Sequence, residues 1–107
     1  MSFKRDVLNQ MQQNFLFAVV RGKTQEEGYE ISKAVYEGGI KNVEVTFSTP
    51  NAEQVMRRLA DEFEGTDMVV GAGTVLDEVS ARLAILNGAK FIVSPNFNEK
   101  IAKMCNI

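Results

Sequence analysis

The sequence predicts an α/β fold built on a parallel β-sheet. Four short apolar runs recur along the 107 residues, as buried strands would, at 15–20, 43–47, 68–72 and 91–93. Segments with the spacing of amphipathic helices separate these runs. A repeat of about 25 residues leaves room for a helix that returns the chain to the same end of the sheet, so neighbouring strands run parallel. We therefore expect a single domain over residues 1–107 with four strand–helix units.

The first elements have recognisable boundaries. A leading helix is expected over residues 3–14, where apolar residues keep helical spacing within a polar stretch. After the first strand, Thr24 and Glu27 have the spacing of a capping box, in which side chains satisfy backbone N–H groups of the first helical turn. Gly38 and Gly39 are expected to end this helix.

The later helices follow the same rules. Thr49 is the predicted N-cap of the second crossover helix, with Pro50 at its first position and Gly65 after its end. Its apolar face consists of Ala52, Val55, Met56, Leu59, Ala60 and Phe63. The third helix, closed by Gly88, has an apolar stripe of Leu76, Val79, Leu83 and Leu86. Asn98 is the predicted cap of a fourth helix that includes Ile101, Ala102 and Cys105.

Composition restricts the chemistry and the partners of the chain. Twelve Lys and Arg residues against fourteen Asp and Glu give a net charge of −2, so no basic field is available for nucleic acid or an anionic membrane. The absence of histidine excludes Ser-His-Asp and His-metal sites formed by this chain alone. We expect no metal and no cofactor.

Cysteine content and hydropathy point to the cytoplasm. The single Cys105 cannot form an internal disulfide, and we expect it to be a small buried apolar residue in a reducing compartment. The longest apolar run, residues 15–20, is too short to cross a bilayer, and the N-terminus does not have the pattern of a signal peptide. A cytoplasmic protein without a membrane partner is expected.

Glu44 is the most informative polar residue at the strand ends, where α/β folds collect their sites. Alternation in residues 43–47 puts Glu44 and Thr46 on the face opposite the apolar side chains. Both faces of a parallel sheet are normally covered, so Glu44 is expected to be buried or at the mouth of a cavity. Desolvation would raise the pKa of its carboxyl and suit it to general acid/base catalysis. The alternative is a half-exposed strand whose polar face meets water.

Arg21 and the glycine-rich residues 71–74 are further candidates. Arg21 directly follows the first strand, where it would bind a carboxylate or phosphate, or pair with Glu44; a structural ion pair is the alternative. Residues 71–74 are expected to form a turn that offers backbone amides and the Thr74 hydroxyl to an anion. Glycines placed for strand–helix packing would give the same pattern. Pro95 marks a turn after the last strand.

None of the lysines has the setting of an imine-forming residue. A Schiff-base lysine needs a desolvated pocket that lowers its pKa, and no lysine lies within an apolar strand. Two of them precede strands and belong to the opposite rim of the sheet. The seven lysines are Lys4, Lys23, Lys33, Lys41, Lys90, Lys100 and Lys103.

Taken in order, the strand ends resemble the class I 2-keto-3-deoxy-6-phosphogluconate (KDPG) / 4-hydroxy-2-oxoglutarate (KHG) aldolase family. The resemblance covers nearly the whole chain. The motifs are Ala18-Val19-Val20-Arg21, Glu37-Gly38-Gly39-Ile40, Val43-Glu44-Val45-Thr46-Phe47 with Thr49-Pro50, Val70-Gly71-Ala72-Gly73-Thr74-Val75, and Gly88-Ala89-Lys90-Phe91-Ile92-Val93-Ser94-Pro95.

The resemblance implies a fold, a reaction and a set of site residues. The fold is a (β/α)8 TIM barrel, of which residues 1–107 are the N-terminal half-barrel with a leading helix, and the family usually assembles as a trimer. Its members cleave a 2-keto-4-hydroxy acid such as KDPG to pyruvate and an aldehyde through a Schiff base. Glu44 is then the general acid/base. The implied substrate-binding residues are Arg21, Gly71, Ala72, Gly73, Thr74 and Pro95.

Two features depart from the family pattern. Ser48 stands where many members have an arginine that also binds carboxylate. The chain also corresponds to about half of a barrel, which takes ~250 residues, and the other half holds the family's Schiff-base lysine and phosphate-binding loops. The 107 residues alone are therefore expected to be inactive as an aldolase. The alternative is a non-catalytic half-barrel scaffold or an anion-binding α/β module.

Overall fold

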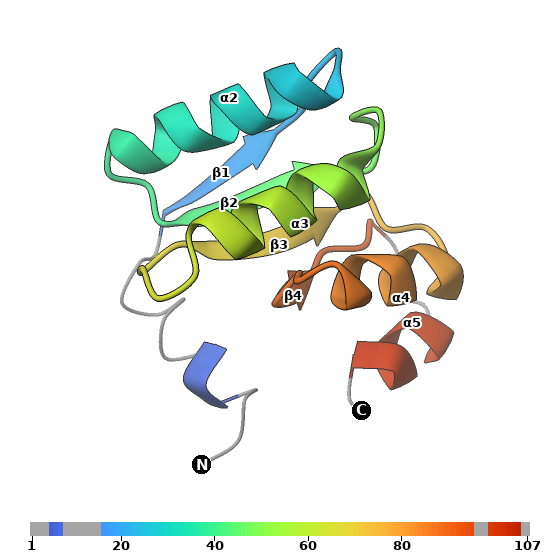
Figure 1. Ribbon diagram of the computed structural model, residues 1–107. Helices are drawn as coiled ribbons and strands as arrows, with labels where there is room; N and C mark the ends of the chain where they lie inside the picture. Colours follow the sequence, from blue (N-terminus) through green and yellow to red (C-terminus); the bar gives the residue numbers. More distant parts are fainter. Residues whose placement is uncertain (1–4, 8–15, 96–98, 106–107) are drawn as a thin grey trace.

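The strands and helices alternate along the chain as the sequence predicts. The computed structural model describes residues 5–7, 16–95 and 99–105. All strands are parallel, and they lie in the order β1-β2-β3-β4 (Figure 1). The elements are β1 (Phe17–Val20), α2 (Gln25–Glu37), β2 (Asn42–Thr46), α3 (Ala52–Glu62), β3 (Val69–Gly73), α4 (Glu78–Leu86), β4 (Phe91–Ile92) and α5 (Glu99–Cys105).

The crossover helices α2, α3 and α4 cover one face of the sheet. Each packs against two neighbouring strands: α2 against β1 and β2, α3 against β2 and β3, and α4 against β3 and β4. The core lies in this layer and includes Val43 and Val45 of β2 with Val55, Met56 and Leu59 of α3, all fully buried. Burial of each such side chain stabilises the fold by about 1.5–3 kcal/mol.

The other face of the sheet is concave. Phe17 and Phe91 belong to the outermost strands, yet their ring centroids are 5.7 Å apart and the rings meet edge to face at 89°. Side chains stand roughly perpendicular to a strand, so rings on the two edges of a flat four-stranded sheet would not meet. The contact therefore indicates a sheet that curls toward this face, as the wall of a barrel does.

Side chains of α3 join it to both neighbouring helices. The Arg58 guanidinium lies 3.3 Å from the ring centroid of Tyr29 on α2, and the Tyr29 hydroxyl donates a hydrogen bond to Glu62. On the other side, Arg57 donates to the carbonyl of Leu86 at the end of α4. The layer of helices is thus continuous over the sheet.

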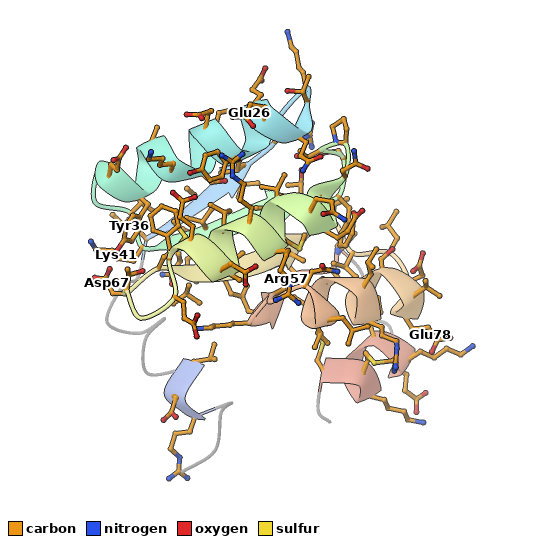
Figure 2. All side chains as sticks on the ribbon, in the orientation of Figure 1. Glu26, Tyr36, Lys41, Arg57, Asp67 and Glu78 are labelled. Atoms are coloured by element: carbon orange, nitrogen blue, oxygen red, sulfur yellow. The ribbon has the colours of Figure 1, made fainter. Side chains whose placement is uncertain are left out.

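The amino-terminal edge of the sheet is held by a polar cluster. Figure 2 shows Tyr36, Lys41 and Asp67 together: the Tyr36 hydroxyl donates to Asp67 at 2.6 Å, and Lys41 lies 3.5 Å from Asp67 and over the Tyr36 ring. The hydrogen bond from Tyr36 lowers the pKa of the Asp67 carboxyl. Lys41 directly precedes β2, so its predicted place on this rim is confirmed.

The start of α3 differs from the prediction. Thr49 and Pro50 precede the helix, and its N-cap is Asn51, whose backbone is left-handed (φ 52°) and whose side chain makes no capping bond. The Thr49 hydroxyl instead accepts a hydrogen bond from the backbone N–H of Gly22 at 3.0 Å. Local spacing could not reveal this partner, which lies 27 residues away.

The apolar stripe of α4 faces solvent rather than the sheet. Leu76, at the start of the predicted stripe, precedes the helix and is 64% exposed; Val79, Leu83 and Leu86 of α4 are 73%, 38% and 58% exposed. Ala81 and Ala84, on the opposite side of the helix, are fully buried in its place. Apolar periodicity located the stripe correctly, but it contains no information on which surface the stripe contacts.

The remaining predictions concern the cap of α2, the terminal helices, Cys105 and membrane-spanning segments. The cap of α2 is confirmed, because Thr24 accepts the Glu27 N–H at 3.0 Å. Residues 5–7 are helical, and the rest of the expected helix 3–14, with the Asn98 cap, lies outside the described residues. Cys105 is exposed rather than buried, and its partial desolvation raises the pKa of the thiol. In the described part of the chain, no helix combines the length and the apolar character needed to cross a membrane.

Candidate functional site

The concave face of β2 carries three polar side chains in a row. Val43 and Val45 point into the helix-covered core, so alternation places Asn42, Glu44 and Thr46 on the concave face. The Asn42 amide donates to the carbonyl of Leu16 at 3.1 Å, and Asn42 is completely buried. Thr46 is 2% exposed and Glu44 9% exposed. The predicted burial of Glu44 is therefore confirmed.

The Glu44 side chain lies across the backbone of β3. A Cβ atom built on Gly73 would stand 2.5 Å from Glu44 Oε2 and 2.9 Å from its Cγ, so the space that a side chain at position 73 would need is filled by Glu44. Burial raises the pKa of the Glu44 carboxyl, as the sequence predicts. No hydrogen bond or ion pair within residues 5–7, 16–95 and 99–105 reaches this carboxylate, so the ion pair with Glu44, one of the alternatives for Arg21, is not formed.

The glycine-rich segment is a strand rather than the predicted turn. Gly71, Ala72 and Gly73 are the last residues of β3, so their amides lie in the plane of the sheet toward β2 and β4. The Ala72 side chain packs in the core under the helices. Thr74, the next residue, is exposed and has φ 56°, a conformation that is unusual for a β-branched residue. Backbone strain of this kind collects at functional sites.

A hydrogen bond fixes the segment that follows β1. The Gly22 N–H, next to Arg21, donates to the Thr49 hydroxyl after β2. A Cβ on Gly22 would collide with the backbone of Gly28, and one on Gly28 would stand 2.9 Å from Thr49 Cγ2. Arg21 is exposed at this end of the sheet. Sequence reasoning assigned Thr49 to the helix cap and so missed this connection.

The other strand ends contribute hydroxyl groups and a proline. Thr46 Oγ1 and Ser48 Oγ are 2.7 Å apart, so Ser48 is hydrogen-bonded to a buried side chain of β2. Backbone bonds join the strand ends, from Phe47 N–H to Gly73 and from Val93 N–H to Ala72. Pro95 is exposed after β4. The topology therefore brings the candidate residues to one end of the sheet (Figure 1).

Other kinds of site are poorly supported in the described part of the chain. It has no group of three or more metal-ligating side chains. A groove of ≈ 440 Å³ lies between α3 and α4, lined among others by Arg57, Phe63 and Lys90, but none of the candidate residues borders it. The Schiff-base chemistry of the lysines is not supported either, because no described lysine lies on a strand.

Comparisons with known proteins agree on one family. The family model for KDPG and KHG aldolase matches residues 7–107. A 2-dehydro-3-deoxy-phosphogluconate aldolase of Treponema pallidum is 37% identical over 87 residues, which are 81% of this chain and 40% of that protein. The KHG/KDPG aldolase of Escherichia coli K12 is 34% identical over 79% of this chain and 39% of its own length. The chain thus spans less than half of these relatives.

Solved structures give the same result for the fold. The 2-keto-3-deoxy-6-phosphogluconate aldolase of Zymomonas mobilis ZM4, crystallised with 3-phosphoglycerate, superposes with a TM-score of 0.79 at 29% identity, over 96% of this chain and 48% of that one. A KDPG aldolase from Legionella pneumophila, with pyruvate captured as a covalent carbinolamine, gives a TM-score of 0.67 at 27% identity, over 82% and 41% of the two chains. The predicted half-barrel of four parallel βα units is confirmed.

Proposed function

The chain belongs to the KDPG and KHG aldolase family, and from this membership we propose that it supplies the acid/base half of a class I aldolase site. The substrate is a 2-keto-4-hydroxy acid such as KDPG or 4-hydroxy-2-oxoglutarate, and the products are pyruvate and an aldehyde. The observation that carries the proposal is Glu44, a buried carboxylate without a polar partner among the described residues, at the carboxyl end of a half-barrel.

The reaction begins on a lysine amine that attacks the C2 carbonyl of the substrate. A carbinolamine forms, water leaves, and the resulting iminium withdraws electrons from C3. The carbinolamine captured in the Legionella relative supports this route. Lys23 lies in the bend after β1, and the other described lysines lie on helices or at the opposite rim, none of them on a strand. We therefore place the imine lysine outside the described residues, in the other half of the barrel.

We assign the proton transfers of this reaction to Glu44. As a base it takes the proton of the C4 hydroxyl, the C3–C4 bond breaks, the aldehyde leaves and the electron pair remains as an enamine at C3. The enamine then takes a proton at C3 from Glu44, and water releases pyruvate from the lysine. As an acid it supports the proton transfers by which the carbinolamine gains and loses water. A carboxyl whose pKa is raised by burial is suited to both roles near neutral pH.

The strand ends around Glu44 hold the substrate. We assign the pyruvyl carboxylate to Thr74, which directly follows residues 71–73 at the carboxyl end of β3, with Arg21 supplying positive charge and Pro95 bordering the same rim. Exposure of Arg21 and Thr74 leaves both free to meet a ligand from the carboxyl end. By family resemblance the working enzyme is a cytoplasmic homo-oligomer, and a trimer is the assembly we propose.

Complementation tests the activity. The chain is co-expressed with the segment of the Treponema relative that it does not match, and co-purification establishes that the two associate. The complex is expected to cleave KDPG, measured as pyruvate through lactate dehydrogenase, and Glu44→Gln to lower the rate about 10²–10⁴-fold. The exposed Glu64→Gln is the matched control and should leave it unchanged. An associated wild-type complex without cleavage would contradict the proposed function.

Borohydride trapping tests the origin of the lysine separately. With pyruvate and borohydride, the complex should gain a covalent adduct on the complementing segment, and the 107-residue chain by itself should gain none. Mass spectrometry of the separated chains distinguishes these outcomes. An adduct on any lysine of this chain would show that the assignment of the imine lysine is wrong.

A further inference from the structure

The strand β3 has no side chain at two successive positions of the concave face, and its neighbours fill both places. Gly73 is covered by the carboxyl end of Glu44 from β2. Gly71 is covered by the ring of Phe91 from β4, because a Cβ at position 71 would collide with three atoms at the far edge of that ring. The two glycines are about 6–7 Å apart along the strand. The Phe91 ring and the Glu44 side chain therefore lie side by side over β3.

The Phe91 ring also meets Phe17 from the opposite edge of the sheet. Phe17 is in register with Asn42, and Phe91 is in register with Gly71 and so with Glu44. The edge-to-face pair thus crosses the concave face diagonally, between the Asn42 row and the Glu44 row. It lies on the amino-terminal side of the Glu44 carboxyl, which points the other way, toward Gly73.

We propose that Phe17 and Phe91 form the floor of the Glu44 site and that Phe91 is a positioning residue for Glu44. The Phe91 ring covers Gly71 and excludes water from the space beside the Glu44 side chain. It leaves open the space over Gly73, where the Glu44 carboxyl lies. The inference rests on the proposed function for the role of Glu44 as acid/base. Its physical content is independent of that role.

The neighbouring strands affect the pKa of Glu44 by shielding its carboxyl from water, because they bring no charge close to it. The three other strands are Phe-Ala-Val-Val, Val-Val-Gly-Ala-Gly and Phe-Ile, so β1, β3 and β4 present no charged or titratable group to it. Burial is the cause of its raised pKa. The β1 side is open, since Val19, in register with Glu44, is 66% exposed. The floor is thus made by β4 and the start of β1.

Carbon NMR of the 107-residue chain tests the proposal without measuring activity. Glutamate carboxyls are labelled with ¹³C, the Glu44 resonance is identified by its loss in Glu44→Gln, and its titration is followed in wild type, Phe91→Ala and Phe91→Leu. Phe91→Ala is expected to shift the Glu44 pKa downward, toward that of a solvated glutamate, because water gains access. Phe91→Leu, which keeps an apolar cover, is expected to restore most of the wild-type value.

The matched control is another aromatic pair among the described residues. Phe63 meets Tyr36 edge to face on the helix side, at 5.2 Å, so Phe63→Ala loses a comparable contact and should leave the Glu44 pKa unchanged. Thermal melting monitors folding of each variant. If Phe91→Ala does not fold, Phe17→Ala, at a ring already 44% exposed, should give a downward shift.

Two results would overturn the proposal. One is an unchanged Glu44 pKa in folded Phe91→Ala or Phe17→Ala. The other is an equal shift in Phe63→Ala, which would attribute the change to general loosening of the fold. Loss of KDPG cleavage in complementation, with the pKa shifts as expected, would refute the proposed function and leave the floor established.

Discussion

Thr49 shows how one hydroxyl can fix a site from outside it. Its oxygen accepts the buried N–H of Gly22, and its methyl group fits against Gly28. The bond joins the segment after β1 to the segment after β2, and Arg21 is adjacent to the donor. The position of Arg21 relative to the β2 strand end therefore depends on this residue.

Replacing Thr49 separates the hydrogen bond from the packing. Thr49→Val keeps the shape but leaves the Gly22 N–H without an acceptor, so the free energy of unfolding should fall by about 1–3 kcal/mol. Thr49→Ser keeps the acceptor and should lose clearly less. Urea unfolding of the two variants measures the difference. Equal losses in both would show that the methyl contact, rather than the hydrogen bond, stabilises this end of the sheet.

Glu44 is expected to destabilise the fold at neutral pH. Its pKa is raised in the folded chain, so the folded state binds its proton more tightly than the unfolded state. Stability therefore decreases as pH rises from the ordinary glutamate range through the folded pKa, and stays low above it. Glu44→Gln should be more stable than wild type at pH 7, by on the order of 1 kcal/mol.

The pH dependence makes this prediction specific. In acid, where the wild-type carboxyl is protonated in both states, the advantage of Glu44→Gln should disappear. Urea titrations at several pH values measure it, with the exposed Glu64→Gln as the reference. A stability difference between Glu44→Gln and wild type that does not vary with pH would contradict burial as the source of the raised pKa.

At the scale of the element, α4 exposes its large apolar side chains to solvent and buries its small ones. The close approach of α4 to its neighbours depends on Ala81 and Ala84, which are completely buried. Leu76, Val79, Leu83 and Leu86 form a solvated face instead. Stability should therefore be sensitive to volume at the alanines and insensitive to polarity at the stripe.

Two substitutions on α4 test whether its large apolar side chains are exposed and its alanines buried. Val79→Lys should change the free energy of unfolding by no more than about 0.5 kcal/mol, as expected for an exposed position. Ala84→Leu overpacks a filled site and should cost about 1–3 kcal/mol. Denaturant unfolding at equal protein concentration provides both values. A large loss for Val79→Lys would mean that the stripe is covered in solution.

The strands and helices show which features of the structure could be predicted from the sequence and which could not. Apolar periodicity, a local property of the chain, predicted the strands and the buried face of α3. On α4 it located an apolar stripe, but the side that packs in the fold is that of Ala81 and Ala84. The burial of Glu44 was predicted from alternation along β2 together with the rule that both faces of a parallel sheet are covered. The cap of α3 was wrong, since the Thr49 hydroxyl is used by a tertiary partner. The Phe17–Phe91 floor was missed; its only local signal is the pair of glycines that alternate on β3.

At the scale of the whole molecule, the inner strands of the described sheet are hydrogen-bonded on both sides and the outer strands on one. Both β2 and β3 are paired on their two edges, whereas β1 and β4 each have one partner strand within the described residues. Open edges leave backbone groups to water and lower the free energy of local opening. The centre of the sheet, which carries Glu44 and Gly73, is therefore expected to be better protected than its two edge strands.

Hydrogen exchange should reproduce this order. Amides of β2 and β3 are expected to exchange most slowly, and those of β4, only two residues long, most rapidly among the strands. Mass spectrometry with peptide resolution measures the rates. In the complex with the complementing segment, protection should increase most at β1 and β4. Equal protection of all four strands in the isolated chain would indicate that its edges are already covered.

The contacts of α2 have an optical consequence. The chain has no tryptophan, and its two tyrosines, Tyr29 and Tyr36, both belong to α2. Each hydroxyl is bound to a carboxylate outside the helix, Glu62 for one and Asp67 for the other. The tyrosine band of the near-ultraviolet dichroism spectrum and tyrosine fluorescence therefore report the docking of α2 on its neighbours. They should hardly respond to events at β4 or α4, so an unfolding curve recorded this way follows one half of the sheet.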